Sequence, residues 1–298
     1  MIRAIQNYGN ELVDVVGSEW NRFWFTPLQA NHLWWLRRVV LVITLLWLVS
    51  FSGQISLVFG NQGWLTLEVV HQTTTDGDLS RTATGFSHLF VGNSPIFLWA
   101  THAVAIAVVV AAVAGFHAWL TTPLSLLVVL SYIHRSPMLT TPFETVLCML
   151  LLYLSIGPFS DRHSNTKSWT ANLSTRLIQI HLCGLYLLIA TSKLGTIVWW
   201  TGDASWYLMT DYQHRLIDLS AMTQSTYAMN AITHAWLLFE LLFPVLIWVK
   251  TLRPLLIFIA CIVWAFAALI TGQVGYCVLM TIANLAFVDP AYLARPRN

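Results

Sequence analysis

Long apolar runs recur along the chain and limit what it can fold into. Hydrophobic residues make up 57% of its 298 residues, and charged residues only 9%, whereas soluble domains carry roughly 25% charged residues. About 20 consecutive apolar residues are enough for a helix to cross the hydrocarbon core of a bilayer. The sequence therefore predicts an all-α polytopic membrane protein whose principal partner is the lipid bilayer.

The spacing of these runs predicts a bundle of about eight transmembrane helices. They lie at about residues 39–59, 96–115, 119–133, 143–159, 177–193, 236–249 with the preceding turn, 255–271 and 273–288. Whether the last of them crosses fully is left open. The predicted organisation is a cytoplasmic or interfacial segment at 1–33, a transmembrane domain at 34–290 and a cytoplasmic tail at 291–298.

The distribution of positive charge predicts the orientation of the bundle. With eight spans, eleven of the fifteen Lys and Arg residues fall on the side of the termini, and cytoplasmic loops are enriched in these residues. Both termini are therefore expected in the cytoplasm, and the protein in the cytoplasmic (inner) membrane as a multi-pass protein. A net charge of only +2 indicates no nucleic-acid partner. On the opposite side, residues 204–219 are expected to form an amphipathic interfacial helix.

Lys193 ends the fifth predicted helix, after an unbroken apolar stretch. A charged residue at the centre of a membrane helix costs about 2.5–3.5 kcal/mol on insertion scales. A lysine near such a position needs a partner, a wet cavity or a path to the interface. A buried lysine that gives up its charge becomes a neutral amine able to accept a proton. Lys193 is therefore a candidate catalytic base.

Glu240 lies in another apolar run and is the second candidate catalytic residue. A carboxylate there must be protonated, paired or facing a cavity, and pairing with Lys193 would lower the solvation cost of both. Two interpretations remain open. Either the pair is structural and fixes helix packing, or Glu240 tunes and relays protons for an outward-facing cavity.

Four further residues are candidates for binding an electron-rich ring or an anionic oxygen. They are His134, Arg135, Trp199 and Trp200, all on the predicted outer side with Lys193. For Arg135, the alternative is contact with headgroup phosphates. The four cysteines show no metal-ligand spacing and are interpreted as packing residues, so no metal is expected.

Several short segments in this order resemble a known family. They are HRSP at 134–137, GPFSDR at 157–162, the stretch 186–194 ending in SKL, WWTG at 199–202 and FELLFP at 239–244. The series resembles the HTTM (horizontally transferred transmembrane) domain of the vitamin K-dependent gamma-carboxylase family, in its short single-domain bacterial form. The resemblance extends over about residues 34–288.

The resemblance implies quinol-linked chemistry at an extracytoplasmic cavity. In the carboxylases, a lysine at the place of Lys193 is the proposed base that removes a proton from reduced vitamin K, which here implies a reduced vitamin K or menaquinone cofactor. Two features depart from the family. The chain ends soon after its last span, without the peptide-binding portion, and Pro137 stands where the family has a histidine. Peptide carboxylation by this chain alone is therefore not expected.

Three functions compete at this stage. One is a carboxylase-like lyase or oxidoreductase that uses a quinol. Another is a non-catalytic accessory protein for maturation or export of a secreted peptide, with a partner protein supplying the soluble domain. The third is a transporter, which no pair of interrupted helices in matching halves supports.

Overall fold

A computed structural model describes residues 2–70, 87–159 and 167–288. The longer helices are α1 (Ile2–Phe25), α2 (Asn31–Ser50), α5 (Pro95–Ala114), α6 (Ala118–Arg135), α7 (Pro142–Ile156), α8 (Trp169–Leu194), α11 (Thr226–Leu246), α12 (Arg253–Thr271) and α13 (Val274–Asn284). The shorter ones are α3 (Ile55–Phe59), α9 (Ile197–Trp200), α10 (Ala204–Thr210), η2 (His88–Phe90), η3 (Pro137–Leu139), η4 (Ser220–Gln224) and η5 (Leu285–Phe287). The predicted tail 291–298 and the segment 160–162 lie outside the described residues.

Within these described residues, five helices are long and apolar enough to cross a membrane, namely α2, α5, α8, α11 and α12. Helices α7 and α13, the latter with η5, are apolar but shorter. Only 28–39% of the residues in the apolar windows of the five long helices are buried inside the protein. Side chains such as Leu188 and Val245 stand 67% and 69% exposed. Apolar surface this extensive requires lipid rather than water, so the chain is a helical membrane protein.

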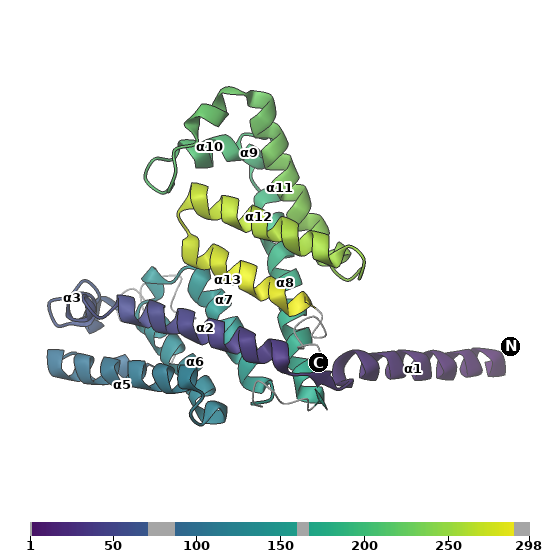
Figure 1. Cartoon of the computed structure of the whole chain (residues 1–298), viewed down its shortest axis with the longest axis horizontal. Coiled ribbons are helices and arrows are strands. Elements are labelled where there is room, and N and C mark those ends of the chain that lie inside the picture. The colour runs from purple at the N-terminus through teal and green to yellow at the C-terminus, as the bar shows by residue number, and fades with distance from the viewer. Residues whose placement is uncertain (1, 71–86, 160–166, 289–298) are drawn as a thin grey trace, which may run out of the picture.

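The helices pack around two connected apolar cores. The larger core joins α2, α7, α8, α11, α12 and α13, and the smaller joins the end of α2 with α3, α5 and α6. In Figure 1, the α12–α13 hairpin lies between α11 and α2, while α9 and α10 lie beside α11 at one end of the molecule. Helix α1 extends away from the remaining helices (Figure 1).

Several predicted elements have different bounds in the structure. Helices α8 and α11 begin at Trp169 and Thr226, well before the predicted residues 177 and 236. The first predicted span, 39–59, is divided: α2 begins at Asn31 and ends at Ser50, and α3 follows after a turn in which Gln54 N–H donates to Phe51 O. The predicted interfacial helix at 204–219 is wrong beyond Thr210, where α10 ends. There the Asp211 carboxylate accepts from Gln213 N–H, a local turn that competes with helix continuation.

Two strands of two residues each form an antiparallel sheet at one end of the bundle. The sequence did not indicate this sheet. Strand β1 (Leu28–Gln29) pairs with β2 (Lys167–Ser168), with Leu28 opposite Ser168. This pairing brings the chain before α2 next to the start of α8. Asn172 strengthens the same junction, because its side-chain N–H donates to Phe23 O of α1 at 2.8 Å.

Arg37 joins α2 to the end of α7. The residue is 5% exposed, and its guanidinium donates to the carbonyl oxygens of Leu154, Gly157 and Pro158 at 3.0–3.4 Å. The last carbonyls of a helix lack intrahelical partners and attract positive charge. Arg37 thereby allows α2 to begin before the basic pair rather than after it.

Tyr186 of α8 ties the centre of the larger core together. Its hydroxyl accepts hydrogen bonds from Trp264 Nε1 of α12 at 2.6 Å and from Asn284 Nδ2 of α13 at 2.9 Å. Its ring stacks on Phe243 of α11 with centroids 4.1 Å apart. One fully buried side chain therefore fixes three helices relative to α8.

We predict that Tyr186→Phe destabilises the protein. The ring remains, but the buried N–H groups of Trp264 and Asn284 lose their shared acceptor, and each unsatisfied buried donor costs about 1–3 kcal/mol. Unfolding followed by circular dichroism in detergent micelles measures the loss. Tyr153→Phe is the matched control, because the Tyr153 hydroxyl bonds His181 at an exposed position. Equal stability of the two variants would contradict the role given to Tyr186.

Candidate functional site

Lys193 and Glu240 form a buried ion pair between α8 and α11. The Lys193 ammonium lies 2.7 Å from Glu240 Oε1 and 2.8 Å from Oε2. The Glu240 side chain is completely buried, and that of Lys193 is 15% exposed. Lys193 therefore turns inward to a partner instead of reaching for the membrane surface, and the predicted pairing is found.

Two indole rings enclose the Lys193 ammonium. Nζ lies 4.3 Å from the ring centroids of both Trp199 and Trp236, which pack edge to face. Trp236 Nε1 also donates to Glu240 Oε1 at 2.8 Å. Cation–π contacts strengthen as water is excluded, so these rings stabilise the ammonium while the indole N–H stabilises the carboxylate.

Thr233 of α11 fixes the chain that carries Trp199. Its hydroxyl donates to Gly202 O at 2.8 Å and accepts from Ser205 N–H at 3.1 Å. Gly202 turns the chain with φ +84°, and a Cβ there would lie 2.5 Å from the Asn230 side chain. Only glycine lets the turn between α9 and α10 approach α11 this closely, and that approach holds Trp199 beside Lys193.

A small pocket of about 230 Å³ adjoins the ion pair. Besides Lys193, Glu240 and their two tryptophans, it is lined by Ile189, Leu208, Trp264, Ala267, Thr271, Gln273, Tyr276 and Cys277. Two of the three ammonium N–H groups point to Glu240, and no described protein group accepts from the third. The pocket therefore combines apolar and aromatic walls with one cationic donor and one carboxylate.

The structure does not bring all the predicted binding residues into this pocket. Trp200 lies outside it, 60% exposed, with its indole N–H donating to Leu194 O. Arg135 is fully buried elsewhere, where it donates to Leu65 O at 2.7 Å and lies over the rings of Phe59 and Phe90. His134, one residue before it, is also not among the lining residues.

Trp236, Gln273 and Tyr276 are site residues that the sequence reasoning missed. A signal was present for Trp236, since it stands four residues before Glu240 and therefore on the same helix face. Gln273 and Tyr276 reach the pocket only because α13 folds back along α12. The sequence pattern does not show which residues of α13 line the pocket.

No family model, no curated protein and no solved structure matches the chain. The chemistry of the site therefore has to be argued from its own geometry. A proton can pass between Nζ and a Glu240 oxygen over 2.7 Å without any movement of the backbone. The pair can exist as ammonium with carboxylate or as amine with carboxylic acid, and in the second form the amine nitrogen accepts a proton.

We predict that breaking the pair destabilises the protein and that removing both charges restores most of the loss. Lys193→Met leaves the Glu240 carboxylate alone in an apolar pocket, at a cost of about 3–5 kcal/mol in the free energy of unfolding. In Lys193→Met/Glu240→Leu, no buried charge remains. Urea unfolding in micelles compares the variants.

Lys250→Met provides the matched control, because Lys250 is exposed in the turn between α11 and α12. It is expected to change the unfolding free energy by no more than about 0.5 kcal/mol. If the double variant is as unstable as Lys193→Met alone, the loss comes from packing and not from an unpaired charge.

Proposed function

We propose that the Lys193–Glu240 pair removes a proton from the ring hydroxyl of a lipid-soluble quinol bound in the adjoining pocket. The observation that carries this proposal is the bidentate ion pair, buried between two indole rings and bordering a cavity. A quinol, such as reduced vitamin K or menaquinol, supplies a flat apolar ring and a weakly acidic hydroxyl.

The residues present fit such a ring. Trp199, Trp236, Trp264 and Tyr276 give the pocket aromatic walls that accept a flat ring. The third N–H of the Lys193 ammonium provides a donor for a ring oxygen. Lys193 and Glu240 would contact only one edge of the bound ring. Small-molecule sites commonly use a few polar groups in this way to orient a mainly apolar ligand.

The proton moves in two linked transfers. Lys193 Nζ gives one proton to Glu240, which becomes a carboxylic acid, and the free amine then takes the proton of the ring hydroxyl. The ammonium re-formed at Nζ faces the negative oxygen left behind and stabilises it. One proton has been transferred from the hydroxyl to the pair, and charge is conserved.

We further propose that the eight helices α2, α5, α6, α7, α8, α11, α12 and α13 cross the inner membrane with both termini cytoplasmic. In this orientation Lys193 lies near the extracytoplasmic end of α8. The eleven-to-four distribution of Lys and Arg supports this orientation. Alkaline phosphatase fused after residue 195 should then be active, and after residue 250 inactive. The reverse pattern would overturn the orientation.

We predict that Lys193→Ala and Lys193→Arg both abolish lysine-dependent oxidation of menaquinol by oxygen. Alanine offers no amine, and arginine does not deprotonate in proteins. Loss of an acid–base group typically lowers rate by about 10²–10⁴. The measurement is quinol consumption, followed by absorbance, with purified protein in lipid nanodiscs. Glu240→Gln should fail as well, because an amide cannot take the proton from Nζ.

Lys250→Ala is the control for these variants and should keep the wild-type rate. Wild-type protein that oxidises menaquinol no faster than Lys193→Ala would overturn the enzymatic proposal. Menaquinol oxidation by Lys193→Arg at the wild-type rate would overturn the role of Lys193 as the base, because arginine keeps the positive charge but does not deprotonate.

A further inference from the structure

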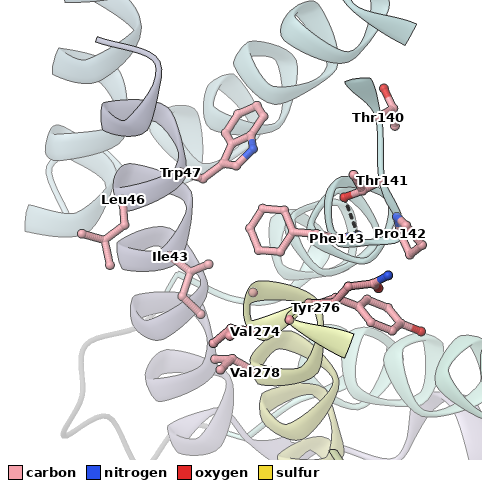
Figure 2. Close-up of a pocket in the computed structure, with 13 residues that line it drawn as sticks. Ile43, Leu46, Trp47, Thr140, Thr141, Pro142, Phe143, Val274, Tyr276 and Val278 are labelled. Carbon is pink, nitrogen blue, oxygen red and sulfur yellow. Dashed lines mark hydrogen bonds between the residues drawn. The ribbon is translucent and has the colours of Figure 1, made fainter. Parts of the chain in front are cut away.

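A second and larger cavity lies beside the ion-pair pocket, between α2, the start of α7 and the α12–α13 turn. It has a volume of about 720 Å³. Figure 2 shows Ile43 and Trp47 of α2 facing Phe143 of α7, with Val274 and Val278 of α13 below them. Val274 and Val278 are 43% and 42% exposed, so this groove, defined by the lining residues of Figure 2, opens to the surface that faces lipid.

At the junction of α2 and α7, the polar side chains beside the groove are paired with one another. Glu144 Oε2 accepts from Thr141 N–H at 2.8 Å and from the Thr141 hydroxyl. Glu144 Oε1 accepts from Trp47 Nε1 at 3.1 Å. These bonds cap α7 and clamp it to α2, and they leave mainly carbon facing the space between the two helices.

Gly275 lets the α13 end of the groove approach α7. A Cβ at this position would lie 3.0 and 3.1 Å from the Phe143 ring, closer than such contacts normally allow. With glycine there, Phe143 forms the floor, and the side chains of Val274 and Val278 stand apart from it as one wall.

The groove and the ion-pair pocket share a wall. Gln273 and Tyr276 line both cavities. The pocket, at about 230 Å³, is smaller than the roughly 300–1,000 Å³ of typical ligand sites, whereas the groove falls within that range. A ligand with a polar ring and a long apolar chain would therefore occupy both the pocket and the groove. Gln273 and Tyr276 lie where the two cavities adjoin.

We propose that the groove holds the apolar chain of the same molecule whose ring hydroxyl faces Lys193, and that Gln273 and Tyr276 mark the passage between the two. This inference rests on the proposed function of the pair. The two cavities have different linings that suit the two parts of the ligand. Aromatic and charged side chains of the pocket surround the ring, and Ile43, Leu46 and Val278 of the groove contact the chain.

The groove positions the ligand more than it strengthens binding. A hydrocarbon chain gains little free energy on moving from lipid into a protein groove, because lipid tails are as apolar as leucine. What the groove supplies is orientation, so that a ring entering from the bilayer meets the ion pair edge first. The test must therefore locate the chain and cannot rely on affinity.

Photolabelling of the protein in nanodiscs locates it. A menaquinol analogue carrying a diazirine on its isoprenoid chain is expected to label peptides of α2 and α13 that line the groove, as identified by mass spectrometry. Menaquinol-4 at ten times its dissociation constant should lower this labelling by about tenfold. Val278→Trp, which fills the groove from an exposed position, should lower it to a similar extent.

Val245→Trp is the matched control. Val245 is 69% exposed on α11 and is not among the residues that line the groove, so this variant should be labelled like the wild type. A phospholipid with a diazirine on its acyl chain tests whether the groove instead holds a chain of an ordinary bilayer lipid. If that lipid labels the groove and menaquinol-4 does not displace it, the groove is an ordinary lipid contact and the inference fails.

A second probe separates failure of the groove from failure of the proposed function. A chainless menadiol analogue with the photoreactive group on its ring should label the ion-pair pocket in wild type and in Val278→Trp. Ring labelling with chain labels scattered over other lipid-facing helices would overturn the groove alone. Absence of ring labelling would overturn the function of the pair.

Discussion

The ion pair of Lys193 and Glu240 is the contact on which the geometry of this end of the molecule depends. Either charge alone would be costly in an apolar bundle, so α8 and α11 must meet where the two side chains reach each other. Once α11 is placed, Thr233 holds the turn at Gly202 and thereby sets Trp199 over Nζ. A buried ion pair is weak evidence for stability by itself, because replacing it with apolar side chains of similar volume is often neutral. What an apolar pair lacks is a transferable proton.

Other polar side chains inside the bundle also join elements that are distant in the sequence. Arg37 reaches the carbonyls at the end of α7, Glu144 accepts from Trp47 of α2, and Tyr186 collects donors from α12 and α13. Apolar packing between lipid-facing helices is weakly directional, since lipid competes for the same contacts. Hydrogen bonds between particular residues therefore set the position of one helix relative to its neighbour along the helix axis. The cavities lie between helices positioned in this way.

The sequence predicted the approximate positions of the apolar helices, because long apolar runs indicate segments that are buried in lipid. It was less successful where hydrogen bonding and not hydropathy decides, as at the break after Ser50 and at Asp211. The partner of Lys193 was predictable from energetics, since few acidic residues lie at membrane depth. His134 and Arg135 show the limit of this reasoning. Charge bias gives the side of the membrane on which a residue lies, but it does not give the helix face or neighbours, and Arg135 turns toward Phe59 and Leu65 instead of the pocket.

The surroundings of the Lys193–Glu240 pair act in opposite directions on its two protonation forms. Burial in an apolar bundle disfavours ammonium with carboxylate, because two charges lose their hydration. The indole N–H of Trp236 and the faces of Trp199 and Trp236 act in the opposite direction by stabilising the charged form. An apolar ring seated in the pocket would displace water and strengthen the electrostatic interactions that remain. The proposed proton transfer requires the amine form when a hydroxyl lies beside Nζ, and the ammonium form when a negative oxygen is left there. A lysine opposite a carboxylate meets both requirements, whereas an arginine would stabilise only the second state.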